Sequence, residues 1–274
     1  MNTNLIPVEI IEDVDDVSNE VTDKDVEAVV VEPKKKVKRT VKQTVPSVKP
    51  TVCLEKFYNA CPDVYEIGVD EAGRGPLFGR VYSGAVILPK DDSFDHSKVK
   101  DSKLFTSKKK IGEAAEYIKA NALAWSVSFE GEDVIDKINI LQATQQAMRQ
   151  AVLETMKQHN SKRERREKYH LLIDGNYFKP ISIPNTEGTK LEVIDFDTVT
   201  GGDNKFSSIA AASILAKVSR DQYILDLCAE NPELVTRYGL DGNKGYGAKV
   251  HLDGIKEYGI TQWHRKTFGI CKLY

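Results

Sequence analysis

Four acidic residues stand where apolar runs of the chain give way to turn residues. Asp70 and Glu71 follow one apolar run, Asp174 ends a second, and Asp203 lies just before a helix rich in small residues. Adjacent carboxylates repel each other unless one is protonated or a hard cation such as Mg²⁺ binds their oxygens. Four acids around one sheet edge suit two divalent metals about 4 Å apart, which would activate a water and stabilise the leaving oxygen in phosphodiester hydrolysis.

Each of these acids also has an ordinary structural explanation. An Asp-Glu pair before a turn is usually a solvated strand end, and an acid near a helix N-terminus is favoured by the helix macrodipole. The residues after the pair favour a binding loop instead. Gly73 and Gly75 flank Arg74, so the backbone there can approach a ligand closely and take a positive φ. With Gly79, their spacing differs from the G-x-G-x-x-G of a dinucleotide-binding fold.

Hydrophobic periodicity predicts the elements that position these residues. Apolar or alternating runs predict strands at residues 67–69, 81–88, 124–129, 169–174 and 191–196. Helical patterns cover residues 108–121, 133–158 and 207–221. Such a mixture of strands and helices predicts an α/β fold, in which ligands bind at the carboxyl ends of the strands. The acids end two of these strands, so the same edge is the predicted site.

Two further residues are candidates for contacts with a nucleic acid. Lys103 lies in a polar loop and could contact a phosphate, although a loop lysine is usually just solvated. Tyr246 stands between Gly245 and Gly247, where its ring can present a flat face to a sugar or a base. Such a tyrosine can equally anchor a loop to the core, and the sequence leaves both readings open.

Charge is unevenly distributed along the 274 residues. Residues 1–32 carry a formal charge of −9, residues 33–49 carry +7, and the remainder is neutral, so net charge does not predict a nucleic-acid partner. Residues 1–50 read as a disordered tail, acidic and then basic.

No stretch resembles a signal peptide, and no apolar run approaches the roughly 18 residues of a membrane span. We expect a reduced, soluble, cytoplasmic protein without membrane contact. Its cysteines show no zinc-site spacing; they are Cys53, Cys61, Cys228 and Cys271.

Several short motifs, each weak alone, together resemble the ribonuclease HII family. They occur in that family's order and cover about residues 65–270. The motifs are Asp70-Glu71-Ala72-Gly73-Arg74-Gly75-Pro76-Leu77, Asp101-Ser102-Lys103-Leu104, Asn139-Ile140-Leu141-Gln142-Ala143-Thr144, Ile173-Asp174-Gly175-Asn176, Gly202-Asp203, Ser208 to Asp221, and Gly245-Tyr246-Gly247.

The resemblance implies a ribonuclease H-like fold, with a mixed five-stranded sheet flanked by helices and a C-terminal helical segment. Residues 51–230 would form the catalytic domain and residues 231–274 a substrate-contacting segment. The implied activity is hydrolysis of the RNA strand of RNA–DNA hybrids, and nicking 5′ to single ribonucleotides embedded in duplex DNA. The products would carry 3′-hydroxyl and 5′-phosphate ends. The resemblance also implies a monomer with roles in DNA replication and ribonucleotide excision repair.

The family's metal ligands match the four acids, and the implied cofactor is a pair of Mg²⁺ or Mn²⁺ ions. Asp221 lies in a matching motif as a fifth acid, and we expect it to be a structural hydrogen-bonding partner. The family's loop for the ribose 2′-hydroxyl matches Gly73, Arg74 and Gly75.

The family's stacking tyrosine matches Tyr246, which would pack on the deoxyribose after the ribonucleotide. Lys103 matches a lysine near the phosphate backbone. Phe78 and Arg80 depart from the family pattern, and the strand register between residues 177 and 203 is left open.

Two alternatives remain at this stage. The sister family ribonuclease HIII shares the acids, but it usually has a folded N-terminal domain and lacks the tyrosine. A non-catalytic nucleic-acid-binding module could also retain the fold, although all four acids are present here.

Overall fold

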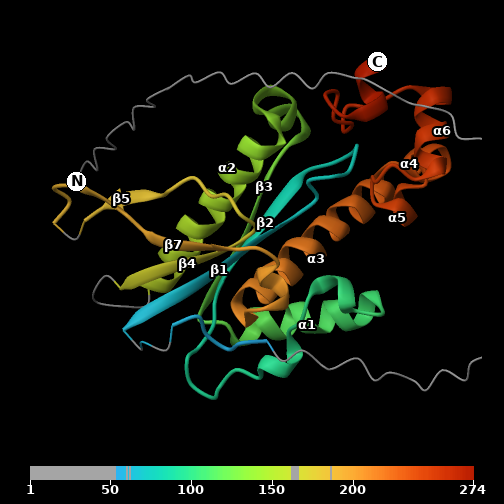
Figure 1. The fold of residues 1–274 in the computed structure, drawn as a ribbon. Helices are drawn as coiled ribbons and strands as arrows, with labels where there is room; N and C mark the ends of the chain where they lie inside the picture. The colour runs from blue at the N-terminus through green and yellow to red at the C-terminus, as the bar shows by residue number, and fades with distance from the viewer. Residues whose placement is uncertain (1–53, 60, 62, 162–166, 186) are drawn as a thin grey trace, which may run out of the picture. The chain divides into compact units, whose positions relative to one another are not determined.

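In a computed structural model of the chain, strand β1 (Val64–Ala72) runs through the middle of a five-stranded sheet (Figure 1). The strand order is β3-β2-β1-β4-β7. β2 (Val81–Ile87) and β3 (Ala124–Glu130) form antiparallel pairs, whereas β4 (Lys168–Asp174) and β7 (Asp195–Val199) run parallel to β1. The predicted mixed sheet is therefore confirmed, and the carboxyl ends of β1, β4 and β7 lie at one edge.

Helices cover both faces of this sheet (Figure 1). α2 (Glu132–Asn160) packs on one face, while α1 (Lys108–Asn121) and α3 (Ser207–Glu230) pack on the other. Successive strand side chains point to opposite faces. In β2, Ile87 accordingly joins the apolar cluster of α2, and Val86 joins that of α1 and α3. Each helical layer thus buries its own apolar core against the sheet.

α3 lies unusually close to the sheet because two strand positions lack a side chain. A Cβ atom at Gly68 would lie 2.1 Å from the backbone carbon of Ser208, and one at Gly84 would lie 2.4 Å from the carbonyl oxygen of Ala212. Small residues on the helix and glycines on the strands therefore allow direct backbone contact. This close packing brings Asp203, just before the helix, to the edge of the sheet.

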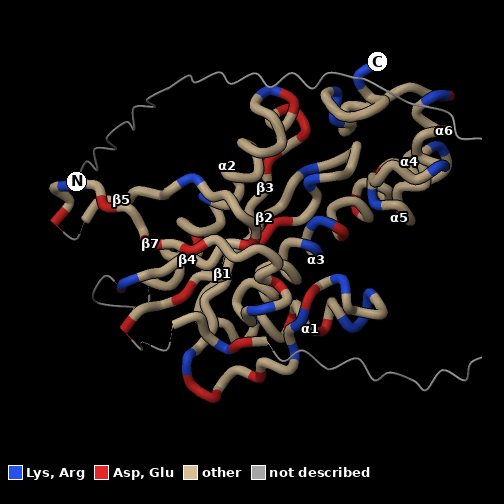
Figure 2. The backbone as a smooth tube through the Cα atoms, viewed as in Figure 1, with Lys and Arg blue, Asp and Glu red and all other residues tan. Residues whose placement is uncertain are grey.

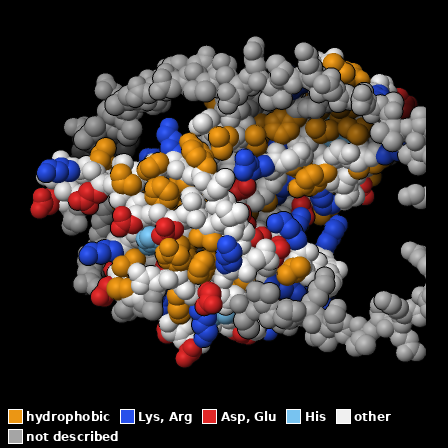
Figure 3. Space-filling view, in the orientation of Figure 1, with side chains coloured by type: hydrophobic (Ala, Val, Ile, Leu, Met, Phe, Trp, Pro, Cys, Tyr) orange, Lys and Arg blue, Asp and Glu red, His pale blue; other side chains and the backbone are white. Residues whose placement is uncertain are grey.

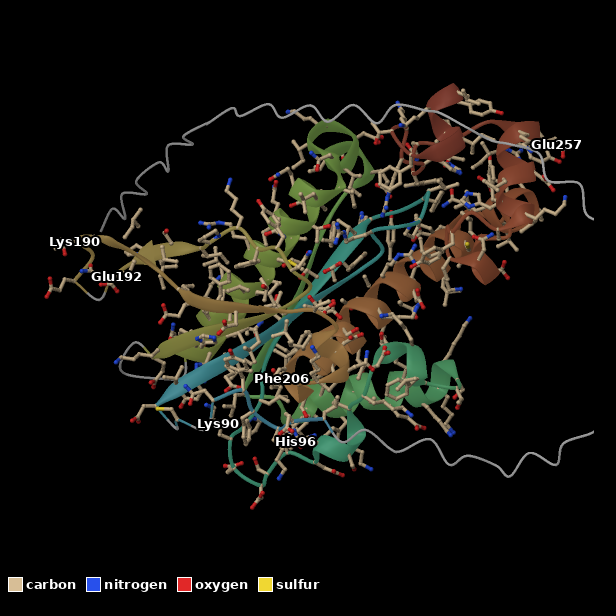
Figure 4. The ribbon with its side chains drawn as sticks, viewed as in Figure 1. Lys90, His96, Lys190, Glu192, Phe206 and Glu257 are labelled. Atoms are coloured by element: carbon tan, nitrogen blue, oxygen red, sulfur yellow. The ribbon has the colours of Figure 1, made fainter. Side chains whose placement is uncertain are left out.

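The segment before β1 also holds the start of α3. Glu55 exchanges backbone hydrogen bonds with Lys205 and Ser207, at 2.7 and 3.0 Å. The ring of Tyr58 lies 5.5 Å, centroid to centroid, from that of Phe206, the residue that precedes α3 (Figure 4). The segment before β1 thereby holds the N-terminus of α3 in place.

Three short helices follow α3: α4 (Glu233–Tyr238), α5 (Leu240–Asn243) and α6 (Lys249–Tyr258). They surround Phe78, which is fully buried in an apolar cluster with residues of α3, α4 and α6. A departure from the family pattern therefore anchors the loop after β1 to the C-terminal segment. A 3₁₀ turn, η4 (Gly269–Leu273), ends the chain.

β1 is longer than its pattern predicts. The apolar pattern predicts a strand that ends at Val69. In the structure, the pairing with β2 continues to Ala72. The pairing with β4 stops at Val69. The sheet therefore opens on one side of β1 at the two acids, although the strand itself does not end there.

Two other elements differ from expectation. The strand predicted at residues 191–196 is divided: β6 (Leu191–Val193) pairs with β5 (Ser182–Pro184), and β7 joins the main sheet. α2 contains one residue, Asn139, with φ 65° and ψ 164°, so the helix is kinked near its start. Hydrophobic periodicity cannot show that a strand is divided between two sheets or that a helix is kinked, because both depend on tertiary contacts.

The structure describes residues 54–59, 61, 63–161, 167–185 and 187–274. The predicted tail at residues 1–50 lies outside them, and the predicted boundary at residue 230 stays a prediction. Within these ranges no helix is both long and apolar enough to cross a membrane. Cys61, Cys228 and Cys271, the described cysteines, are free thiols.

Candidate active site

The predicted acids converge at the carboxyl ends of β1 and β4, where Figure 2 shows acidic positions near the start of α3. Asp70, Glu71 and Asp174 line one cavity of about 220 Å³. Asp203 lies in a 3₁₀ turn, Gly202–Asn204, before α3. Its Oδ2 is 3.3 Å from Nζ of Lys103, which lines the same cavity.

The acids are held by hydrogen bonds to neighbouring groups. Asp174 Oδ1 accepts from the Gly202 N–H at 2.7 Å, which connects the end of β4 to the turn that carries Asp203. Asp70 Oδ1 accepts from the Glu71 N–H at 2.6 Å, and Glu71 Oε1 lies 3.4 Å from Arg74 Nη1. These contacts hold the carboxylates at the sheet edge.

The surroundings of these carboxyls disfavour their charged forms. Burial raises the pKa of Asp70 well above its usual value, and the nearby charges of Glu71 and Asp174 raise it further. Burial also raises the pKa of Glu71, against the opposing effect of Arg74. For Asp203, burial raises the pKa more than Lys103 lowers it. The site therefore gathers more negative charge than its protein partners neutralise.

The donor set fits a hard divalent cation in its chemistry, because it consists of carboxylate oxygens, which such ions prefer. As placed, however, no three His, Cys, Asp or Glu side chains of the described residues form a group that could hold a metal ion.

The loop that follows the acids is shaped by a buried arginine. Arg265 is fully buried and donates hydrogen bonds to the carbonyl oxygens of Gly73, Arg74, Pro76 and Gly79, at 2.6 to 2.9 Å. Since a guanidinium offers five N–H donors in a rigid plane, one side chain holds four carbonyls of the loop. The sequence did not single out Arg265, although it stands in the aromatic and basic run after Gln262.

A second buried arginine supports the same loop. Gly73 has φ 95°, and a Cβ atom there would lie 2.6 Å from Nε of Arg220. This meets the expectation that glycine is needed at Gly73; Gly75 is not among the positive-φ glycines. Arg220 also donates to the Lys244 carbonyl and lies 3.4 Å from Asp221. Asp221 is thus a hydrogen-bonding partner, as predicted from the sequence.

Tyr246 faces the cavity and is not part of the core. Its side chain is 50% exposed, and it lines the cavity together with Gly73. A Cβ atom at Gly75 would lie 3.7 Å from the Tyr246 ring, so the loop and the tyrosine are neighbours. The Arg220 guanidinium lies 5.5 Å from the centre of the ring on its protein side. The reading of Tyr246 as a core anchor is therefore wrong.

A buried histidine pair lies behind Tyr246. His251 Nδ1 is 2.9 Å from the Tyr246 carbonyl, and the two Nε2 atoms of His251 and His264 are 3.1 Å apart. The Thr261 N–H donates to His264 Nδ1 at 2.9 Å. One arrangement of protons satisfies every contact: both imidazoles are neutral, His264 donates from Nε2, and His251 donates from Nδ1 to Tyr246. Sequence patterns gave no signal for this pair.

The structure brings the predicted site residues together. The residues that line the cavity are Asp70, Glu71, Gly73, Lys103, Asp174 and Tyr246. Arg74, Gly75 and Asp203 lie beside Glu71, Tyr246 and Lys103 respectively. Arg80, the other departure from the family pattern, lies between the rings of Phe129 and Tyr223, at 4.1 and 4.3 Å.

Comparison with known proteins identifies the family. The model of the family described as "Ribonuclease HII" matches residues 67–271. A ribonuclease HII of Parabacteroides distasonis is 45% identical over 204 residues, which are 74% of this chain and 89% of the relative. The ribonuclease H2 structure from Pyrococcus horikoshii has a TM-score of 0.54 and 22% identity, and the match covers 76% of this chain and 96% of that one.

A ribonuclease HIII structure, "Bst-RNase HIII in complex with Mn2+", has a TM-score of 0.51 and 18% identity, and its match covers 72% of this chain and 63% of that one. At such low identities the two structures establish the ribonuclease H-like fold alone. The family match and the relative at 45% identity decide between the sister families. The chain therefore belongs to the ribonuclease HII family, whose members hydrolyse the RNA strand of RNA–DNA hybrids.

Proposed function

We propose that this ribonuclease nicks duplex DNA on the 5′ side of a single embedded ribonucleotide, and leaves a 3′-hydroxyl and a 5′-phosphate. The observation that carries the proposal is the shared cavity: Gly73 of the glycine loop and Tyr246 line the same space as Asp70, Glu71 and Asp174. The groups proposed to contact the ribose and the next sugar thus lie beside the candidate catalytic acids.

The four acids, Asp70, Glu71, Asp174 and Asp203, are the proposed ligands of two divalent ions, Mg²⁺ or Mn²⁺. Bound there, such ions would lower the pKa of a water and stabilise the leaving oxygen. The water oxygen forms a bond to phosphorus, the P–O3′ bond breaks, and the O3′ atom takes up a proton. Burial raises the pKa values of Asp70, Glu71 and Asp203, and the charge of Asp174 raises all three further. A bound cation would offset this cost of ionisation, which supports a cation at this edge.

The protein's own groups select the substrate. The backbone of Gly73, Arg74 and Gly75, held by Arg265, is proposed to bind the 2′-hydroxyl that distinguishes RNA from DNA. The ring of Tyr246 packs on the deoxyribose that follows. Lys103, largely exposed and 3.3 Å from Asp203, contacts a backbone phosphate beside the acids.

In the cell, we propose that the enzyme works as a cytoplasmic monomer and removes ribonucleotides that DNA replication leaves behind, in ribonucleotide excision repair. The folded N-terminal substrate domain typical of the sister family is not part of this proposal. Residues 1–50, which precede the matched region, are proposed to be dispensable for the chemistry.

A labelled DNA duplex with one ribonucleotide tests the proposal directly. We expect a nick 5′ to the ribonucleotide with Mg²⁺ or Mn²⁺, and none with a chelator. Cleavage of a continuous RNA–DNA hybrid alone would point to a ribonuclease HIII-like specificity. Binding of both substrates without cleavage, under every metal condition, would identify a catalytically inactive module.

A further inference from the structure

A second groove lies next to the active site, between the start of α1 and the middle of α3. Its volume is about 490 Å³, and it shares Ser102 and Lys217 with the active-site cavity. Its lining is apolar toward the core and carries lysines from three parts of the chain: Lys108, Lys217 and Lys244. Figure 3 shows Lys and Arg side chains on the face where α1 and α3 lie.

Lys244 is an unusual residue in this groove. Its exposure is only 8%, and it has φ 54°, in the left-handed region that favours glycine. Its carbonyl accepts a hydrogen bond from Arg220, and its Nζ donates to the Asp241 carbonyl. A lysine in strained backbone is found where the fold gains something from its side chain.

Lys244 lies close to a second lysine of the groove. Burial lowers the pKa of Lys244, the ammonium of Lys108 lowers it further, and Asp221 and Asp241 act in the opposite direction. The Asp221 carboxylate is also 2.8 Å from Lys217, so it is shared between lysines. Two ammonium groups from separate elements therefore lie together at the groove, and a bound anion would favour the charged form of both.

The start of α1 also carries positive charge without a neighbouring acid in its first turn. Its first turn holds three lysines, Lys108 to Lys110, and no acid. Cations at the N-terminus of a helix oppose the macrodipole, whereas an anion there is stabilised by it and by the free N–H groups of the first turn. Ser107 satisfies only one of these, the N–H of Lys110, at 3.2 Å.

We propose that this groove binds a phosphate of the nucleic-acid backbone, held by Lys108 and Lys244, at a linkage other than the one that is cleaved. The inference rests on the proposed function, because it assumes a duplex in the active site. A phosphate there would neutralise the lysine pair and face the N-terminus of α1. It would also set the path of the duplex past Tyr246, two residues after Lys244.

Scanning the substrate with single methylphosphonate linkages tests the proposal, since each such linkage removes one backbone charge. The assay measures KM and kcat for nicking of a duplex with one ribonucleotide. For Lys108→Ala and Lys244→Asn we expect KM to rise about three- to tenfold with kcat nearly unchanged, and the log–log salt dependence of binding to fall by about one unit. Asparagine is chosen at Lys244 because it tolerates a positive φ.

The decisive result is coupling between enzyme and substrate. One methylphosphonate linkage should raise KM for the wild-type enzyme and have little further effect on Lys108→Ala. The matched control is Lys109→Ala: Lys109 is the next residue of α1, its side chain is 86% exposed, and it pairs with Glu113 at 3.9 Å. Its KM should stay within about twofold of wild type.

Two outcomes would overturn the site: wild-type KM in both variants, or equal losses in Lys108→Ala and Lys109→Ala without dependence on any one linkage. Thermal unfolding of each variant separates misfolding from lost contact, and Lys108 is exposed, so its removal leaves the core intact. Nicking by the wild-type enzyme in the same assay reports on the proposed function separately.

Discussion

The carboxylate of Asp174 ends β4 and accepts a hydrogen bond from the Gly202 N–H at 2.7 Å. Asparagine at this position keeps the size and the acceptor oxygen but removes the negative charge. A metal ligand and a merely structural acid therefore respond differently to the same substitution, which makes Asp174 the sharpest single-residue test of the acid cluster.

Asp174→Asn should lower kcat for nicking at least about 100-fold, because a lost ligand removes several kcal/mol of transition-state stabilisation. Binding of the uncut duplex, measured by fluorescence anisotropy in chelator, should remain within a few fold of wild type. Unchanged turnover in Mg²⁺ would remove Asp174 from the proposed metal site.

Tyr246 is the second test at this scale. Its ring is half exposed and stands beside Gly75, so substitution changes a contact surface and leaves the core intact. Tyr246→Ala should reduce kcat/KM at a single ribonucleotide about tenfold, since stacking on an aromatic ring contributes about 1–3 kcal/mol. Tyr246→Phe, which keeps the ring, is the matched control and should stay near wild type. Equal losses of plain duplex binding and junction cleavage would refute a stacking role.

At the level of elements, the loop after β1 depends on a residue almost two hundred positions away. Arg265 donates to four loop carbonyls and is fully buried, so the loop and the C-terminal segment form one hydrogen-bonded unit. The glycine loop needs little conformational freedom of its own, because its shape is imposed from outside.

Arg265→Lys should therefore destabilise the protein by about 2–4 kcal/mol, because one ammonium leaves several buried carbonyls unpaired. Urea unfolding followed by circular dichroism measures this loss. Lys266→Ala, at the exposed neighbouring position, should change the free energy of unfolding by less than about 0.5 kcal/mol. Comparable stability of Arg265→Lys and wild type would show that the four contacts are dispensable.

The histidine pair links α6 to the C-terminal turn and gives stability a pH dependence. Burial, with a smaller effect of the neighbouring His251, lowers the pKa of His264 from 6.5 to about 3. The unfolded chain therefore binds a proton that the folded protein rejects between about pH 6.5 and pH 3. Stability from this residue is complete above that window and falls as the pH is lowered through it.

Between pH 7.5 and about pH 5 we expect the free energy of unfolding of the wild type to fall relative to that of His264→Gln, because the variant has no proton to gain at this position. Urea titrations at each pH, on both proteins, measure the two slopes. Parallel slopes would mean that other groups cause the acid sensitivity.

At the scale of the whole molecule, the arrangement of charged groups matters more for substrate binding than the net charge does. The chain after residue 49 has no net formal charge, so binding of a polyanionic substrate depends on how charged groups are arranged, and Lys103, Lys108 and Lys244 are the proposed contacts. The matched family region begins at residue 67, well after the charged N-terminal blocks.

Removal of residues 1–50 should therefore leave thermal stability and kcat for single-ribonucleotide nicking close to those of the full chain. The basic block at residues 33–49 could still add non-specific affinity, so the salt dependence of duplex binding should be compared as well. A truncated protein that does not fold, or that no longer nicks, would contradict the interpretation of this segment as a tail.

The sequence by itself determined where most elements lie and which residues are candidates for the chemistry. Periods of 2 and 3.6 are local properties, so β2, α1 and α3 start where their patterns start. The acids were visible for the same reason, since each follows a local apolar run or precedes a helical one.

Tertiary structure alone decided how these parts combine. β1 passes its predicted end because β2 continues to pair with it, and residues 191–199 divide between two sheets. The Arg265 contacts and the lysines of the second groove join residues far apart in the chain, and the histidine pair joins α6 to a separate segment 13 residues further on. No local pattern encodes such contacts: they exist because α3 packs against Gly68 and Gly84 and carries the C-terminal segment to the loop after β1.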